Sequence, residues 1–341
     1  MREHGETSAK PVLFGFPPSL NSYRLIDDKW MRLARNAILV LGAPRSGTTW
    51  LAKIVDSHPD ILYRHEPDEL CPPNPALDPA AQIAAWLCHR GLRSVAKRPL
   101  FAKSWRPAPL TIARNAMAAA LSGAQRMPVC RTLAAQMPLP DLVLPPRSRS
   151  VRAALKLVNW DGTAAARTMA PVRCIFILRH PCAQVASVLA GQATRRLAAG
   201  AESLALAKAW AARGGVDAAA FAALPEAGRL AWTWLAFNEP ALDGLRGSAN
   251  ARVILYEDLC KAPAPVSREL FGFAGLDWHP QTAAFLDQST REDRGGGYFD
   301  VFRAGASVAE RWRTTMSAAD QEAVRSVVAG SALAGCWPDL V

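Results

Sequence analysis

The residues best suited to chemistry are concentrated in one glycine-containing turn. Gly42-Ala-Pro-Arg45-Ser46-Gly47-Thr48-Thr49-Trp50 directly follows the short apolar run 38–41. A strand, a glycine turn and a helix in this order aim backbone N–H groups and the positive end of the helix at one point, which forms a cradle for an anion. Arg45 adds a permanently charged fork, and the hydroxyls of Ser46, Thr48 and Thr49 add further donors. The turn is therefore predicted to bind a phosphate or sulfate group.

The turn differs from the phosphate loop of nucleoside triphosphatases at one decisive position. In the pattern G-x-x-x-x-G-K-[ST] a lysine follows the second glycine, and it contacts the β- and γ-phosphates. Here Thr48 stands in that place. A kinase or nucleoside triphosphatase with a variant loop stays as an alternative, which dependence on magnesium and ATP would reveal.

Two further basic residues lie within or directly after predicted strands. Arg179 follows the apolar run 174–178, and Ser187 lies two helical turns further on. Pro181 suits a sharp start of the intervening helix, which would let Arg179 and Ser187 converge on one anion. Lys156 lies inside the apolar run 153–158, where a buried charge needs a partner.

The positioning elements alternate between strand and helix. Short apolar runs predict parallel strands, and segments of helical spacing separate them. The expected strands are 38–41, 61–63, 153–158, 174–178 and 252–256, and the expected helices are 48–57, 161–170, 181–191, 202–213, 226–246, 263–274 and one starting at Ser317. This order predicts an α/β fold, a doubly wound parallel sheet flanked by helices, with its ligand at the carboxyl ends of the strands.

The chain is interpreted as one domain with two additions. Residues 1–36 form a polar lead-in, and residues 37–341 form a single α/β domain. Residues 70–150 are Pro-rich and contain helical segments but no clear strand. They are interpreted as a cap-like insertion that binds the acceptor. Gly295-Gly-Gly297 predicts a flexible loop near the C-terminus.

Composition narrows the class of protein. The formal net charge of +11 favours polyanionic partners, but the basic residues form no compact Lys/Arg tract, which disfavours nucleic acid. A nucleic-acid-binding module stays as the non-enzymatic alternative, and a steep salt dependence would reveal it. Seven scattered cysteines without a C-x-x-C pair indicate reduced thiols and no zinc site. No apolar run reaches the roughly 18 residues of a membrane span. A cytoplasmic location is expected, and the oligomeric state stays open.

The motifs, in their order along the chain, resemble those of the PAPS-dependent sulfotransferase family, including its bacterial and carbohydrate-type members. PAPS is 3'-phosphoadenosine 5'-phosphosulfate. Pro44–Trp50 resembles the 5'-phosphosulfate loop, and Arg179 with Ser187 resembles the 3'-phosphate motif. The resemblance implies a P-loop-like fold and transfer of a sulfuryl group to an acceptor hydroxyl. It also implies that Trp50 stacks on the adenine, although core packing is an equal reading.

Other segments resemble the family less specifically. Glu310-Arg311-Trp312-Arg313 is similar to the basic segment that closes over the 3'-phosphate, so Arg311 and Arg313 are cofactor-binding candidates. Tyr256-Glu257 and Trp232-x-Trp234 also resemble family segments, and they are interpreted as structural.

Several residues are candidates for the group that accepts the proton of the acceptor hydroxyl. The resemblance makes Lys156 and Arg45 stabilisers of the leaving group, but the Lys-Thr-His run of cytosolic members is here Lys156-Leu-Val, without the histidine. In carbohydrate-type members the glutamate that acts as the base follows the second strand and precedes a proline. Glu66, which precedes Pro67, is therefore the candidate base. His65 is the alternative, followed by Asp68, Glu69 and Asp161, and an inactive homologue also stays open. The expected acceptor is a small molecule or glycan: a sugar, glycolipid or natural-product hydroxyl. No metal is expected.

Overall fold

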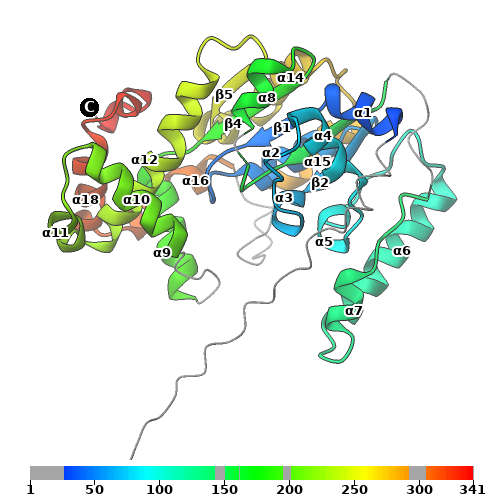
Figure 1. Cartoon of the computed structure of the whole chain (residues 1–341), viewed down its shortest axis with the longest axis horizontal. Coiled ribbons are helices and arrows are strands. Elements are labelled where there is room, and N and C mark those ends of the chain that lie inside the picture. Colours follow the sequence, from blue (N-terminus) through cyan, green and yellow to red (C-terminus); the bar gives the residue numbers. More distant parts are fainter. Residues whose placement is uncertain (1–26, 143–149, 161, 195–200, 292–304, 341) are drawn as a thin grey trace, which may run out of the picture.

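A five-stranded parallel β-sheet forms the centre of the protein (Figure 1). The computed structural model describes residues 27–142, 150–160, 162–194, 201–291 and 305–340. The strands are β1 (Ile38–Leu41), β2 (Ile61–His65), β3 (Arg152–Lys156), β4 (Arg173–Leu178) and β5 (Ala251–Leu255), and they lie in the order β2-β3-β1-β4-β5. Each strand was predicted from its apolar run, and the bounds differ by at most a few residues.

Helices cover both faces of the sheet, so the predicted doubly wound α/β fold is confirmed. Alternate residues of each strand point to opposite faces. In β1, Leu39 and Leu41 join the larger core cluster, whereas Ile38 and Val40 join the other cluster. The larger cluster contains side chains of α1, α4, α8, α9, α12 and α18, and the other contains side chains of α2, α13, α14, α15 and α16.

The helices have the following bounds: α1 Asp28–Arg35, α2 Thr48–Asp56, α3 Pro67–Leu70, α4 Pro79–Cys88, α5 Leu92–Val95, α6 Ala108–Ala124, α7 Arg131–Gln136, α8 Thr163–Thr168, α9 Pro181–Ala193, α10 Ala201–Arg213, α11 Ala218–Ala223, α12 Glu226–Leu245, α13 Tyr256–Lys261, α14 Pro263–Ala274, α15 Pro280–Arg291, α16 Gly305–Glu310, α17 Trp312–Thr315 and α18 Ala318–Val328. The last helix begins where Ser317 accepts a hydrogen bond from the Asp320 N–H, as its capping pattern predicts.

The lead-in and the insertion both contribute to the core. Helix α1 lies inside residues 1–36, and its Trp30 and Leu33 are buried. Residues 70–150 divide into two parts. Helix α4 packs against α1, with Ile83 and Trp86 in the larger core, whereas α6 and α7 project from the body at the end far from α18 (Figure 1). The glycine-rich loop around Gly295 lies outside the described residues.

The strand order places a switch point beside β1. The chain passes from β1 to β2 and back to β3 on one side, then crosses to β4 and β5 on the other. In such sheets the crevice outside the carboxyl ends of the strands holds the ligand. Among the described residues, no helix is both long and apolar enough to cross a membrane, and no three metal-ligating side chains cluster.

Candidate active site

The turn between β1 and α2 adopts a backbone that only a few side chains tolerate. Arg45 and Gly47 both have left-handed backbone angles, with φ of 72° and 100°. A Cβ atom at Gly47 would lie well inside van der Waals contact with the ring of Tyr256, so the turn needs a glycine there. Left-handed angles at non-glycine residues are concentrated at functional sites, where the surrounding structure enforces them.

Arg45 brings the two predicted anion-binding motifs together. Its Nε donates a hydrogen bond to Ser187 Oγ at 3.2 Å, and its backbone carbonyl accepts one from Arg179 Nη1 at 2.9 Å. Arg179 leaves the end of β4, and Ser187 lies on α9, as the sequence predicted. The structure therefore gathers Arg45, Arg179 and Ser187 at the carboxyl end of the sheet, between β1 and β4.

Two buried polar atoms in this group lack a partner among the described residues. They are the hydroxyl oxygen of Ser46, a residue that is fully buried, and Nε of Arg179, a residue that is 8% exposed. A buried donor without an acceptor is costly, so such atoms require an explanation. Donors from the turn, a helix N-terminus and the guanidinium of Arg179 together fit the oxygens of a phosphate or sulfate ester.

Two residues that were interpreted as structural hold Arg179 in place. The indole Nε1 of Trp234 on α12 donates to the Arg179 carbonyl at 3.0 Å, and the Arg179 guanidinium lies 4.6 Å from the centre of the Tyr256 ring. Tyr256 is the first residue of α13, at the end of β5. The sequence placed Tyr256 at a strand end, which was the available signal, but did not assign it to the site.

Lys156 and Glu66 form an ion pair at the opposite side of the turn. Lys156 ends β3 between Val40 of β1 and His65 of β2, and it is only 2% exposed. Its Nζ contacts Glu66 Oε1, and the other carboxylate oxygen of Glu66 lies 3.0 Å from Arg93 Nη2 on α5. Glu66 is thus the anionic partner of the buried Lys156 in this structure, and a contact of Lys156 with the cofactor stays a prediction. No sequence pattern pointed to Arg93.

The charges around Glu66 set its protonation. Burial raises the pKa of this carboxyl, but the adjacent charged groups, chiefly Lys156 and also Arg93, outweigh burial and lower the pKa to about 2. Glu66 is therefore ionised at neutral pH. Its backbone is left-handed, with φ of 49°, as at Arg45.

His65 is neutral in this structure. Burial lowers the pKa of its imidazole to about 3, against the opposing effect of Glu66. Its Nδ1 shares a hydrogen bond of 2.9 Å with the Tyr63 hydroxyl, and its Nε2 lies 3.6 Å from Glu66 Oε2. Both groups therefore hold a proton weakly in this structure, and His65 stays the alternative base.

The remaining candidate bases have structural contacts. Asp68 accepts hydrogen bonds from the backbone N–H groups of Val158 and Asn159, at 2.8 and 2.6 Å, and so fixes the chain after β3. Glu69 pairs with Arg93. Asp161 lies outside the described residues.

The other cofactor-binding candidates have varied surroundings. Trp50 is half-buried, donates from Nε1 to Ser289 Oγ at 3.1 Å, and meets the Tyr256 ring edge-on. Arg313 pairs with Glu310 and, at 3.1 Å, with Asp339, while Arg311 is exposed. Thr48 is buried at the first position of α2, and Thr49 is its second residue. The roles of these residues in binding a cofactor stay predictions.

Comparison with known proteins identifies the group to which this site belongs. A model described as "Sulfotransferase family" matches residues 37–280, from just before β1 to the first residue of α15. The chain belongs to the sulfotransferase family. The matched range contains the turn, Glu66, Lys156, Arg179 and Ser187.

Individual sulfotransferases resemble the chain over shorter or looser alignments. Mouse carbohydrate sulfotransferase 5 is 32% identical over 84 residues, which are 24% of this chain and only 21% of that protein's length. The sulfotransferase domain from the curacin biosynthetic pathway is 15% identical, with a TM-score of 0.41 over 86% of this chain and 97% of that chain. Mouse sulfotransferase SULT7A1, solved in complex with PAP, is 13% identical, with a TM-score of 0.40 over 92% of this chain and 94% of that chain.

Proposed function

We propose that this sulfotransferase transfers the sulfuryl group of PAPS to the hydroxyl of an acceptor. One observation carries the proposal. The left-handed Arg45 contacts both Ser187 and Arg179, although these residues lie far along the chain, and donors without partners surround it. This is the arrangement expected of a site for a nucleotide with anionic groups at two positions.

The proposed cofactor site extends along the carboxyl ends of β1 and β4. The backbone of residues 45–49 and the hydroxyls of Ser46, Thr48 and Thr49 would hold the 5'-phosphosulfate. Arg179 and Ser187 would hold the 3'-phosphate, with Arg311 and Arg313 beside it. Trp50 would contact the adenine. The product of the reaction would be adenosine 3',5'-bisphosphate (PAP).

The catalytic roles follow from charge and position. When bound, PAPS supplies an activated sulfuryl group, whose in-line transfer resembles phosphoryl transfer in depending on positioning and charge stabilisation. Arg45 and Lys156 provide positive charge for the leaving-group oxygen. Glu66 accepts the proton of the acceptor hydroxyl, because its carboxylate is ionised and lies at the same end of the sheet.

The ion pair between Lys156 and Glu66 links these roles. Burial alone raises the pKa of Glu66, and the charge of Lys156 is the largest factor that lowers it. Any anion that draws Lys156 away from Glu66 therefore raises the pKa of Glu66 toward the range in which a carboxylate is an effective base. The same lysine would thus stabilise the leaving group and leave Glu66 more basic.

The acceptor is inferred from the sequence at Glu66, and the compartment from the cysteines. The glutamate-proline element at Glu66 supports a sugar or glycolipid hydroxyl, although a natural-product hydroxyl fits equally. The seven cysteines are all free, which supports a reducing compartment such as the cytoplasm.

Nucleotide binding tests the proposal before an acceptor is known. We expect PAP without magnesium to raise the thermal midpoint, because a ligand at about a hundred times its Kd stabilises a protein by about 2.7 kcal/mol. AMP should have a weaker effect, since it lacks the 3'-phosphate. A shift with magnesium-ATP and none with PAP would refute the proposal and favour a variant nucleoside triphosphatase.

A matched pair of arginine variants assigns the shift to this site. Arg179→Ala removes a guanidinium that contacts the turn, and it should abolish most of the stabilisation by PAP. Arg213→Ala is the control. Its guanidinium also lies over an aromatic ring, 4.8 Å from the centre of the Trp210 ring, but it belongs to α10 and not to the candidate site. The Arg213 variant should retain the full shift. Equal losses in both variants would place PAP elsewhere.

A further inference from the structure

Helix α6 presents most of its apolar residues to solvent and its polar residues to the protein, while Ala118 and Leu121 pack inward. Its polar residues are Thr111, Arg114, Asn115 and Ser122, of which Arg114 is buried and the others are half-buried. Arg114 donates to the Val95 carbonyl at 2.7 Å. The exposed residues of the opposite face include Ile112, Ala113, Ala116, Met117, Ala119 and Ala120. A helix on the surface of a soluble protein normally has the reverse arrangement.

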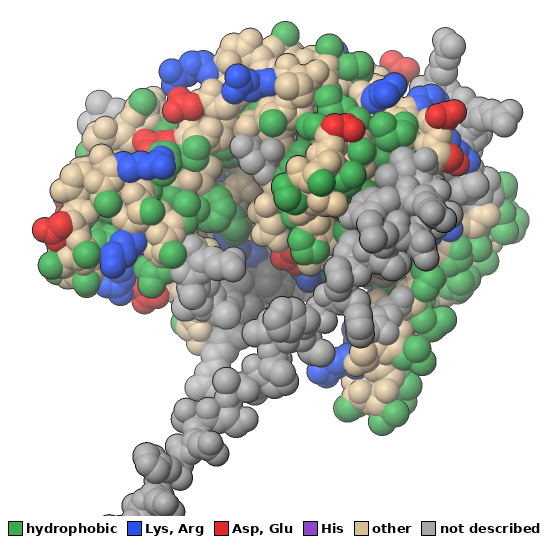
Figure 2. Space-filling model, viewed as in Figure 1, with side chains coloured by type: hydrophobic (Ala, Val, Ile, Leu, Met, Phe, Trp, Pro, Cys, Tyr) green, Lys and Arg blue, Asp and Glu red, His purple; other side chains and the backbone are tan. Residues whose placement is uncertain are grey.

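The apolar surface continues through the turn after α6 and along α7. Met127 is 58% exposed, Val129 94% and Leu133 67%. Of the twelve large apolar side chains that are exposed in the described part of the chain, seven lie between residues 110 and 137. Figure 2 shows apolar side chains gathered along this projecting part of the molecule. We call residues 108–136 the arm. A continuous exposed apolar surface of this kind indicates a binding surface.

The positive charge of the protein is concentrated in the same region. Between Asp78 and Asp141 the sequence contains nine Lys or Arg residues and no acidic residue, so this stretch supplies +9 of the chain's formal +11. Four of these cations are buried or paired, for example Lys103 with Asp56 and Arg106 with Asp141. Arg98, Arg126 and Arg131 are exposed.

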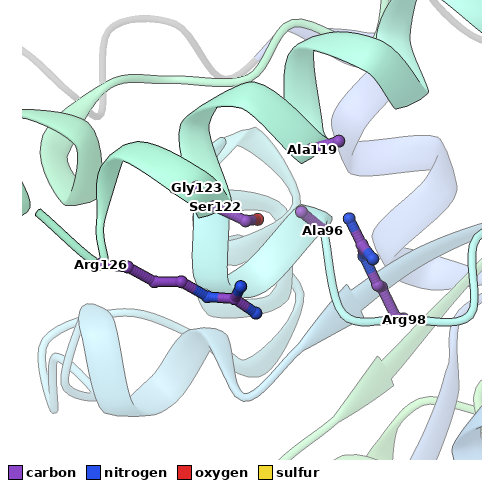
Figure 3. A pocket seen from close by; sticks show the side chains of 6 residues that line it. All are labelled: Ala96, Arg98, Ala119, Ser122, Gly123 and Arg126. Carbon is purple, nitrogen blue, oxygen red and sulfur yellow. The ribbon is translucent and has the colours of Figure 1, made fainter.

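Two of the exposed arginines border one hollow beside α6. Arg98 and Arg126 point into it from opposite sides (Figure 3), and Ala96, Ala119, Ser122 and Gly123 complete its lining. The hollow has a volume of about 310 Å³. Among the described residues, neither guanidinium group has an ion-pair or hydrogen-bond partner. Two guanidinium groups without a carboxylate between them would attract a phosphate group.

We propose that the arm binds the surface of an anionic phospholipid bilayer. Ile112, Met117 and Val129 would enter the acyl region, and Arg98 and Arg126 would contact lipid phosphates. An apolar face bordered by cations is the pattern of segments that lie in the membrane interface, and each cation near an anionic surface adds to the affinity. A second copy of this chain is the poorer occupant, because two arms would bring like charges together.

The arm connects to the candidate active site through α5. Helix α5 packs against β2, α6 and α7, and its Arg93 contacts Glu66. A bilayer on the arm would therefore lie at the flank of the site nearest the proposed base. The inference about lipid does not depend on the proposed sulfuryl transfer.

Vesicle sedimentation of the full chain tests the proposal. The protein should sediment with vesicles of phosphatidylcholine and phosphatidylglycerol, and weakly with phosphatidylcholine alone. Ile112→Glu with Met117→Glu should lower binding by at least about tenfold, since two charges would enter the acyl boundary. Arg98→Glu with Arg126→Glu should lower it similarly. The matched control is Leu204→Glu with Leu206→Glu, two leucines of α10 that are 49% and 39% exposed, and this variant should bind like the parent.

Three results would overturn the proposal. The first is no sedimentation of the parent protein with either vesicle, and the second is equal sedimentation with both. The third is a dimer of the parent in light scattering that the Ile112 and Met117 changes convert to monomer, because a second copy would then cover the arm. Retained stabilisation by PAP shows that each variant is folded. If PAP stabilises none of the proteins but vesicle binding follows the pattern above, the proposed function fails and the lipid surface stands.

Discussion

Replacing Glu66 with glutamine isolates the proposed base with little disturbance of its surroundings. Glutamine keeps a side-chain oxygen that can accept from Lys156, so the contact between β2 and β3 remains while the proton acceptor is lost. General base catalysis contributes about 10²- to 10⁴-fold, which is about 2.7 to 5.5 kcal/mol in the activation free energy. We expect kcat to fall by this factor. Affinity for PAP should not fall, because no cofactor contact is assigned to Glu66 and loss of its charge leaves Lys156 freer to contact an anion.

The pH dependence of the parent enzyme provides the second half of this test. The profile of kcat/KM reports groups in the free enzyme, where the pKa of Glu66 is about 2. It should therefore show no acid limb from Glu66 across roughly pH 5 to 8. The profile of kcat reports the bound enzyme and should show an acid limb at higher pH, if Lys156 has left Glu66. Wild-type turnover in the Glu66→Gln enzyme, measured with its true acceptor, would refute the reasoning.

Three further changes test separate parts of the structure. Ser187→Ala should weaken PAP binding by on the order of tenfold in calorimetry, the usual effect of losing one hydrogen bond to a charged group; unchanged affinity would remove Ser187 from the site. Gly47→Ala should abolish stabilisation by PAP, whereas Gly215→Ala, also left-handed at φ of 83° but with open space around it, should not; similar behaviour would show that backbone strain alone matters. Asp141→Asn should lower the free energy of unfolding in urea by about 3 kcal/mol or more, since it strands two buried guanidinium groups. Burial raises the pKa of Asp141, but the adjacent arginines lower it overall, so its stabilisation is present at neutral pH and lost as the pH falls through that lowered pKa; a variant that loses as much stability on acidification as the parent would contradict this.

The sheet and the anion-binding turn were predictable because local sequence specifies both. The central strands β1 and β4 are buried on both faces and so read as short apolar runs, and the glycine turn follows the first run directly. The spacing of Arg179 and Ser187 indicates an anion site only because a predicted strand directly precedes Arg179. Their convergence on Arg45 followed from the rule that parallel strands end at one edge of the sheet.

Contacts between distant segments could not be predicted in the same way. Arg93 reaches Glu66 because α5 packs on β2, and nothing near Arg93 in the sequence signals this. The burial of Trp30 was missed because α1 is rich in charged residues outside its buried stripe. The arm was interpreted as a cap because proline and alanine are common there, but which face of α6 meets the protein depends on its packing against α5.

The position of β3 has a consequence for how the chain folds as it is synthesised. β1 and β2 do not pair with each other, because β3 lies between them and pairs with both. A nascent chain that has emerged only as far as α7 therefore has two strands with unpaired edges, and the position of β3 between them is empty. We call this position the slot. The slot closes when residues 152–156 arrive, after the whole of α4 to α7 has emerged. Long-range parallel pairing of this kind is slow and leaves strand edges open to aggregation. Fragments that end before Arg152 are thus expected to be captured by chaperones, and those that extend past β5, which pairs with the outer edge of β4, to be released.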